Sequence, residues 1–205
     1  MNNSIATVFI IDDDPAVRDA LSLMIEQENL AVAAFENAEA FLASCQSECY
    51  GCAIIDIRMP GMDGMQLQEV LSKRNMHLPV IFLTGHGDIP MSVQAMKAGA
   101  MDFLTKPVTR DKLLAAVRLA IQKSEIAMAE NTNHQEALSR LANLTDRERN
   151  VMLLAIQGHP NKDIARKLGI SHRTVEIHKS KIMHKTGAAN LLDLARIVHE
   201  GEASI

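Results

Sequence analysis

No apolar run in this sequence reaches the length that a membrane-spanning helix requires. The first residues, Met1-Asn2-Asn3-Ser4, lack the basic segment that opens a signal peptide. These two absences argue against a membrane partner and favour a cytoplasmic protein. The remaining composition is ordinary for a soluble globular chain, since 47% of the 205 residues are hydrophobic and 22% are charged. That length favours two modest domains, each able to bury a core.

Cysteine is scarce, and the three cysteines, Cys45, Cys49 and Cys52, lie close together. A zinc site would need a fourth ligand. In addition, Cys52 falls in an expected strand, where neighbouring side chains point to opposite faces. We therefore expect three reduced thiols rather than a metal site.

Charge is unevenly distributed along the chain, whose formal net charge is −4. Residues 1–123 carry 10 Lys and Arg against 15 Asp and Glu, whereas residues 158–190 carry 7 against 2. An acidic first half followed by a basic patch indicates a regulatory module joined to a nucleic-acid reader.

The first half alternates short apolar runs with segments of helical periodicity. The run 7–11 ends directly in Asp12-Asp13-Asp14-Pro15, where Pro15 suits the first turn of a helix. Five such alternations predict an α/β fold with a doubly wound, five-stranded parallel sheet covered on both faces. The expected strands are 7–11, 31–35, 52–56, 79–84 and 101–104; the expected helices begin at Pro15 and lie at 38–45, 64–74, 89–98 and 110 onward.

Polar residues follow these strands. The carboxyl ends of parallel strands share one edge, so Asp12, Asp13, Asp56 and Thr84 should converge there. Three carboxylates repel one another without a counter-charge, and oxygen ligands of this kind select Mg²⁺. Lys106 follows the fifth strand and brings an ammonium to the same edge. Such a site is equipped to accept a phosphoryl group, with an aspartate as the nucleophile.

Other interpretations of these acids exist. Asp56 precedes the turn Met59-Pro60-Gly61, so an alternative role for this acid, taken by itself, is merely to cap that turn. A hydrolase could also use an aspartate nucleophile with Mg²⁺. No second general acid or substrate pocket is evident from the sequence, so turnover beyond slow self-dephosphorylation is not expected, and we do not expect an enzyme.

The combination of motifs is more specific than any one of them. The Asp12-Asp13 pair, the strand-end Asp56, Thr84 and Lys106-Pro107 resemble the receiver domain of two-component response regulators over about residues 1–123. The stretches Thr84-Gly85-His86-Gly87-Asp88-Ile89-Pro90-Met91 and Ala95-Met96-Lys97-Ala98-Gly99-Ala100 resemble the FixJ-like branch in particular. The implied fold is flavodoxin-like.

This resemblance implies a role for each matching position. Asp56 would be the phosphoacceptor. Asp13, Asp56 and the Arg58 carbonyl would ligate Mg²⁺, with Asp12 acting mainly through water. Lys106 would pair with the phosphoryl group, and the Lys106-Pro107 bond would be cis.

The resemblance also implies a switch pair. Thr84 would move toward the phosphate, and Phe103 would fill the space it leaves. Many receivers have Tyr where this chain has Phe103, so a contact that depends on a hydroxyl is excluded here. Plain core packing is the alternative role for Phe103.

Residues 124–140 are expected to link the two domains, either as one long helix or as a helix that frays into a tether. Beyond them, Leu144-Thr145-Asp146-Arg147-Glu148 is a capping box that opens a helix. Asn161 and Ser171 should cap the next two helices, with Gly169 between them, and Asn190 should start a fourth. Residues 141–205 are therefore expected to form an all-α, four-helix domain with helix-turn-helix spacing.

The sequence motifs of this half strengthen its assignment as a helix-turn-helix domain. Asn161-Lys162-Asp163-Ile164-Ala165, Leu168-Gly169-Ile170-Ser171 and Thr174-Val175-Glu176-Ile177-His178 resemble the LuxR-type DNA-binding domain over about residues 140–200. A receiver followed by this domain is the NarL/FixJ architecture.

The helix from residue 172 should then enter the major groove of DNA. Val175 and Ile182 are assigned to packing; His178 is assigned either to packing or to base reading. Glu176, Ile177 and Ser180 face base edges, where Glu can accept from cytosine N4 and Ile can meet a thymine methyl. Phosphate contacts, or else merely solvated charges, are expected of Arg173, Lys179, Lys181 and Lys185, and further DNA contacts of Asn161, Lys162 and Thr174.

The sequence thus predicts a transcription factor, an activator by analogy, that is switched when a sensor histidine kinase phosphorylates Asp56. Its expected partners are that kinase, double-stranded promoter DNA, RNA polymerase and, after phosphorylation, a second copy of the chain bound through the face built from 88–110. A protein-interaction module without DNA binding is the remaining rival, and the basic segment 158–190 argues against it.

Overall fold

The computed structural model describes residues 5–45, 49–85 and 89–202, and the chain divides into two compact units, Met1–Met128 and Ala129–Ile205. The motif residues His86, Gly87 and Asp88, and the N-terminal residues 1–4, lie outside the described residues. No helix in the described ranges has both the length and the apolarity needed to cross a bilayer.

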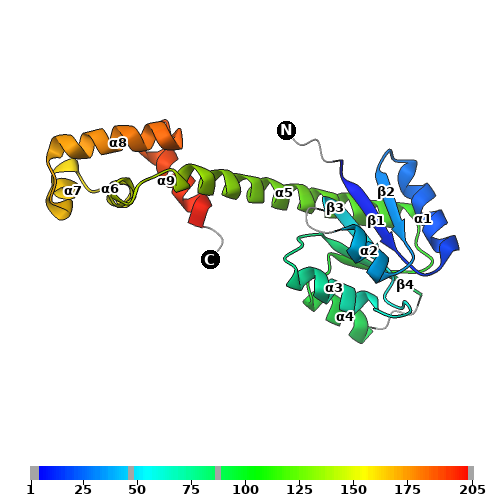
Figure 1. Ribbon diagram of the computed structural model, residues 1–205. Helices are drawn as coiled ribbons and strands as arrows, with labels where there is room; N and C mark the ends of the chain where they lie inside the picture. The colour runs from blue at the N-terminus through cyan, green and yellow to red at the C-terminus, as the bar shows by residue number, and fades with distance from the viewer. Residues whose placement is uncertain (1–4, 46–48, 86–88, 203–205) are drawn as a thin grey trace. The chain divides into compact units, whose positions relative to one another are not determined.

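The N-terminal unit is a five-stranded parallel sheet with the strand order β2-β1-β3-β4-β5 (Figure 1). The interior strands β3 and β4 are buried throughout, as expected for a sheet covered on both faces. The sheet confirms the doubly wound fold expected from the sequence. Its strands are β1 (Thr7–Ile11), β2 (Ala31–Phe35), β3 (Gly51–Ile55), β4 (Val80–Thr84) and β5 (Asp102–Thr105).

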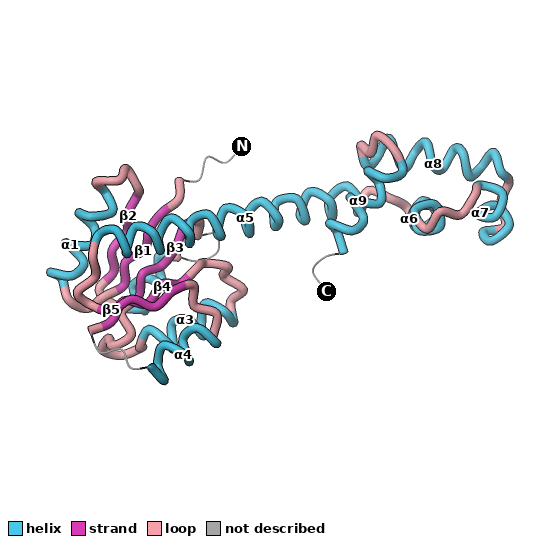
Figure 2. Tube along the Cα trace, turned by 180° about the vertical axis from the view of Figure 1, so that it is seen from behind, coloured by secondary structure: helices cyan, strands magenta, loops and turns pink. Residues whose placement is uncertain are grey.

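Helices cover the two faces of the sheet separately, as both views of the chain show (Figures 1 and 2). One face packs on α1 and α5 and the other on α2, α3 and α4, because alternate strand residues point to opposite sides. These helices are α1 (Pro15–Glu26), α2 (Ala38–Ser44), α3 (Gly64–Lys73), α4 (Ile89–Lys97) and α5 (Arg110–Ala142).

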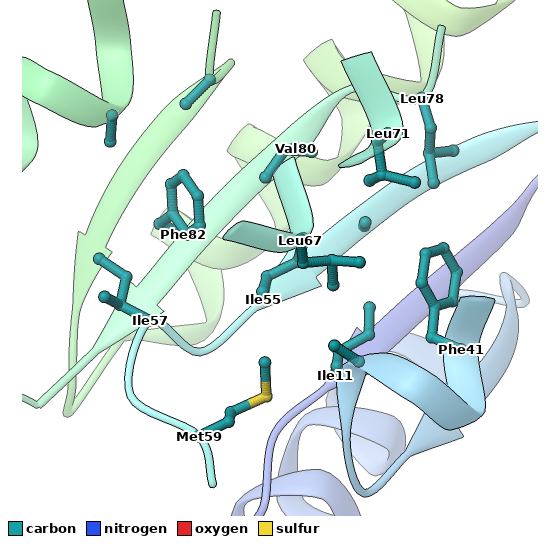
Figure 3. Packing of buried hydrophobic residues seen from close by; sticks show 14 of the residues in the cluster. Ile11, Phe41, Ile55, Ile57, Met59, Leu67, Leu71, Leu78, Val80 and Phe82 are labelled. Atoms are coloured by element: carbon teal, nitrogen blue, oxygen red, sulfur yellow. The ribbon is translucent and has the colours of Figure 1, made fainter. Parts of the chain in front are cut away.

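The core beneath α2 and α3 combines aliphatic side chains with the five phenylalanines of the chain (Figure 3): Phe41 and Phe82 are buried in it, and Phe9, Phe35 and Phe103 pack against it. Ile11 and Ile55, the last residues of β1 and β3, are fully buried in it and stand opposite each other in the sheet. This core therefore fixes the level at which β1 and β3 end. The next residues, Asp12 and Asp56, emerge side by side at the same edge.

Cys45 and Cys49 lie close together in the structure, with Cα atoms 6.1 Å apart. The expectation that the cysteines are reduced thiols stays a prediction for this pair. Cys52 is a free thiol, and burial raises its pKa to about 12.

Helix α5 extends from Arg110 to Ala142 and includes the residues expected to link the two domains. Its first turns bury Leu113 and Val117 against the sheet. Further along, Glu125 accepts a hydrogen bond from the Tyr50 hydroxyl (3.0 Å), and Ser124 accepts one from the Gly51 amide (3.2 Å). The helix is thus tied to the amino end of β3, opposite the edge that carries the aspartates.

The C-terminal unit contains the last turns of α5 and four helices that confirm the predicted helical domain. Ala137 of α5 is buried in the same core as Val151, Ile164 and Leu194. Gly169 adopts the left-handed conformation (φ 64°) that ends one helix and starts the turn to the next. The four helices are α6 (Asp146–Ile156), α7 (Asn161–Leu168), α8 (His172–Thr186) and α9 (Leu191–Glu202).

The capping box at the start of α6 is present and carries an additional contact. The Glu148 carboxylate, 4% exposed, accepts hydrogen bonds from the Thr145 amide (2.9 Å) and from Lys185 Nζ (2.7 Å) of α8. The bond from Lys185, followed by that from Thr145, lowers the pKa of Glu148 to about 2. One carboxylate therefore joins the first turn of α6 to the last turn of α8.

Replacing Glu148 by Gln tests this link. Gln can keep the capping bonds but leaves Lys185 without its carboxylate, so E148Q should destabilise the C-terminal unit by about 2 kcal/mol at neutral pH. Because the folded pKa of Glu148 is below its ordinary value of 4.5, its contribution is present above pH 4.5 and disappears as the pH falls toward about 2.

Urea unfolding followed by circular dichroism between pH 7 and pH 2.5 measures both effects. E148Q should lose less stability than the wild type over that acid range. The matched control is E176Q, because Glu176 is 57% exposed. Equal pH profiles for E148Q and the wild type would contradict the assignment.

Candidate metal centre and nucleic-acid interface

Three aspartates meet at the carboxyl edge of the sheet. Asp12 follows β1 and Asp56 follows β3. These two strands are neighbours where the strand order reverses, because the chain passes from β1 to β2 on one side and then from β2 back to β3 on the other. Carboxylate oxygens of Asp12, Asp13 and Asp56 all lie within 4.8 Å of one another. The structure therefore brings together the acids that the sequence analysis selected.

Lys106 is the cation of this cluster. Its ammonium donates to Asp12 Oδ2 (2.6 Å) and to Asp56 Oδ2 (2.9 Å). Burial alone would lower the pKa of Lys106, but the bonds to these carboxylates outweigh it and raise the pKa, so the side chain stays charged. The peptide bond from Lys106 to Pro107 is cis, as the resemblance implied.

Asp12 and Asp56 differ in their surroundings. The Asp12 side chain is 2% exposed, and burial raises its pKa although Lys106 and the Asp14 amide bond to it. The Asp56 side chain is 11% exposed, and its Oδ1 accepts a bond from the Arg58 amide (3.3 Å). Asp56 is thus held in place but remains within reach of an incoming group.

The donor set fits a magnesium ion. Hard carboxylate oxygens from three residues converge, and Asp13 is exposed, which leaves the side toward solvent open for water or a phosphoryl oxygen. One ammonium against three carboxylates leaves a local excess of negative charge, which a divalent cation would neutralise.

The start of α3 packs directly on the phosphoacceptor candidate, a feature that the sequence analysis missed. A Cβ on Gly64 would collide with the Asp56 carbonyl, so only glycine permits this approach. Asp63 is the N-cap of α3, in a capping box with Gln66. The Pro-Gly-rich turn therefore leads into a helix that is seated against Asp56.

Thr84 and Phe103 lie on neighbouring strands near the same edge. Thr84 ends β4, is 1% exposed, and its carbonyl accepts a bond from the Lys106 amide (2.8 Å). Phe103 on β5 is partly buried, with its ring centroid 6.4 Å from that of Phe82. Thr84 is therefore bonded to the backbone of Lys106, and Phe103 lies on the strand that leads to Lys106.

The exposed surface of α8 is the candidate nucleic-acid interface. Val175 and Ile182 are buried, which confirms their assignment to packing, and His178 is partly buried with its Nδ1 atom covered. Ile177 is 48% exposed, although it is a large apolar side chain on a helix surface. The exposed residues of α8 are Arg173, Glu176, Ile177, Ser180, Lys181 and Lys185, together with His172 and His184, which were not selected from the sequence.

Several expected DNA contacts are occupied within the protein. Lys185 forms the ion pair with buried Glu148, and the Lys179 ammonium donates to Asn161 Oδ1 (3.0 Å). The expectation that Asn161 caps α7 is wrong, because Pro160 holds the cap position and Asn161 is already helical. Thr174 bonds with Ser171 at the start of α8, and Lys162 is exposed.

Two families account for most of the chain. Residues 8–118 match the response regulator receiver domain, and residues 142–198 match the bacterial regulatory proteins of the luxR family. The chain is 40% identical over 190 residues to the transcriptional regulatory protein FixJ of Bradyrhizobium diazoefficiens, covering 93% of each protein. It is 37% identical over 205 residues to the response regulator protein TodT of Pseudomonas putida, covering 100% of this chain and 90% of TodT.

Solved structures agree with these similarities. The response regulator StyR matches with a TM-score of 0.86 and 40% identity, over 96% of this chain and 100% of that one. Full-length FixJ from B. japonicum matches with a TM-score of 0.58 and 38% identity, over 98% of each chain.

Proposed function

This chain belongs to the response regulators that join a receiver domain to a LuxR-type DNA-binding domain, and on that premise we propose that phosphorylation of Asp56 by a sensor histidine kinase controls its binding to promoter DNA. The observation that carries the proposal is the bridge from Lys106 to both Asp12 and Asp56. It places a charged ammonium against Asp56, whose carboxylate remains within reach of an incoming group. We assign residues 1–123 to the receiver, 124–140 to the linker and 141–205 to the DNA-binding domain.

The chemistry at Asp56 is nucleophilic. A carboxylate oxygen of Asp56 attacks the phosphorus of the kinase's phosphohistidine; the P–N bond breaks, and the imidazole leaves with the electron pair. Lys106, already 2.9 Å from Asp56, is placed to pair with the new phosphoryl oxygens. Mg²⁺, held by Asp12, Asp13, Asp56 and the Arg58 carbonyl, would supply further neutralisation of charge on those oxygens.

Thr84 and Phe103 are the proposed switch pair. A phosphoryl group adds negative charge and three acceptor oxygens at Asp56, and the Thr84 hydroxyl is a donor at the end of the adjacent strand. Rotation of Thr84 toward that group would open space that Phe103 can fill from β5. Phe103 has no hydroxyl, so in this chain the switch operates through packing.

Helix α4 is the proposed dimer surface, within the face that we expect to extend over 88–110. Ala95 is its buried residue, while Ile89, Val93 and Met96 are 80%, 46% and 47% exposed. Their spacing of four and three residues places them on one side of the helix. A second copy of the chain would bury this apolar stripe after phosphorylation and bring two α8 helices to adjacent half-sites.

On DNA, α8 is proposed to lie in the major groove. Glu176, Ile177 and Ser180 would contact base edges; Arg173 and Lys181 would contact phosphates, with Lys162 approaching from α7. Lys179, Thr174 and Asn161 would act at the edge of the interface, since their side chains also bond within the protein. His184 extends the same exposed surface.

We further propose that the protein works in the cytoplasm and activates transcription through contact with RNA polymerase. Slow self-dephosphorylation is the catalytic activity we assign to it. FixJ, to which it is similar, is described as a transcriptional regulatory protein, which supports regulation of genes rather than turnover of a metabolite.

The Asp56→Asn variant tests the central proposal. With acetyl phosphate and Mg²⁺, the wild type should bind promoter DNA about 5–150-fold more tightly, the usual range of coupling between two sites. D56N should show no response, because its amide is not a nucleophile. The measurement is fluorescence anisotropy with labelled DNA.

The control for this experiment is D111N, an equivalent change at an exposed acid in the first turn of α5. It should respond like the wild type. A D56N protein that responds to the phosphodonor as the wild type does would refute the role of Asp56.

The dimer surface is tested by Val93→Glu. A carboxylate in the α4 stripe should be costly to bury, so phosphorylated V93E should sediment as a monomer under conditions in which the phosphorylated wild type is a dimer. Analytical ultracentrifugation gives the mass, and Phos-tag electrophoresis confirms equal phosphorylation. L23E, at an exposed position of α1, is the control and should still dimerise; dimers of V93E would exclude this surface.

The two lysines of α8 allow a matched test of DNA contacts. K181A should weaken binding to all sequences and reduce the slope of log K against log salt by about 0.9, the value for one lost phosphate contact. K185A should leave that slope unchanged and instead lower the stability of the C-terminal unit, because Lys185 pairs with Glu148. Equal slope changes in both variants would contradict this division of roles.

A further inference from the structure

Arg18, on the first turns of α1, contacts the loop that carries two of the aspartates. Its Nη1 donates to the Asp12 carbonyl (2.7 Å) and to the Asp13 carbonyl (3.0 Å). Its own amide donates to the Asp14 carbonyl (3.1 Å). One residue thus holds three successive carbonyls of the loop between β1 and α1.

The remaining bonds of this loop show why the contact matters. The Asp12 amide bonds to Phe35 of β2, and the Asp14 amide bonds to Asp12 Oδ1. The carbonyls of Asp12 and Asp13 follow the last strand residue, Ile11, so the strand ladder ends before them. Arg18 supplies their donor, and a planar guanidinium with five N–H groups is suited to joining two acceptors.

We infer that Arg18 is a positioning residue of the metal centre, and this rests on the proposed function. By fixing the backbone between Asp12 and Asp13, it keeps both carboxylates directed toward Asp56, where their oxygens lie within 4.8 Å. Arg18 is half-buried and its described bonds are to backbone carbonyls, so its effect on Mg²⁺ passes through the loop.

A second role for Arg18 would have the opposite consequence. If the guanidinium acted only as a nearby positive charge, it would repel Mg²⁺, and its removal would tighten binding. If it positions the loop, its removal frees Asp13 to leave the cluster, and binding weakens. The sign of the change therefore separates the two roles.

The experiment is a Mg²⁺ titration of the full chain, without phosphodonor and at constant ionic strength, followed by amide resonances in ¹⁵N NMR spectra. Arg18→Met should weaken Mg²⁺ binding about 10–100-fold, the usual effect of losing a residue that orients metal ligands. Arg18→Lys keeps the charge but lacks the planar fork, so it should also bind more weakly than the wild type. Unchanged or tighter binding by both variants would overturn the inference.

Arg74→Met is the matched control, because Arg74 is exposed at the end of α3. It removes the same charge and should keep wild-type affinity. Thermal melts without Mg²⁺ should show R18M folded with a transition close to that of R74M. A wild type that binds no Mg²⁺ would overturn the metal centre and this inference with it, whereas an R18M affinity equal to the wild type would overturn the inference alone.

Discussion

Repulsion among three carboxylates is the constraint on which the carboxyl edge of the sheet depends. Two like charges 4 Å apart repel by about 1 kcal/mol in water and by about 4 kcal/mol near a protein surface. Asp12, Asp13 and Asp56 are held at comparable spacing, and Lys106 offsets only part of their charge. The folded unit therefore keeps an excess of negative charge at this edge. That excess favours the binding of a cation, and the bound cation would in turn hold a phosphoryl group.

The helices around this edge differ in how firmly they are held. Gly64 seats α3 against the Asp56 backbone, and a capping box fixes its first turn. Helix α4 has one buried side chain, Ala95, and a stripe of exposed apolar residues. Of the helices near Asp56, α3 is thus firmly held and α4 is loosely packed. This difference favours α4 as the element that moves.

Sequence reasoning succeeded where the controlling pattern was local. Strand β1 and Asp12 were predictable because an apolar run ends directly in acids, and Ser171 was predictable because a cap precedes its helix. The contacts of Arg18 and Lys185 were not, because each depends on which elements pack together. Lys185 looks like any basic residue on a recognition helix until Glu148, 37 positions earlier, is placed beside it.

The hydrogen bond from Tyr50 to Glu125 has an optical consequence. The chain contains no tryptophan, and Tyr50 is its one tyrosine. Ultraviolet emission beyond the weak contribution of phenylalanine therefore originates at a single phenol, whose hydroxyl is bonded to a carboxylate on α5. Carboxylate acceptors quench tyrosine emission, so its brightness depends on whether α5 keeps Glu125 against the base of β3. The protein carries its own fluorophore at the place where the long helix leaves the sheet.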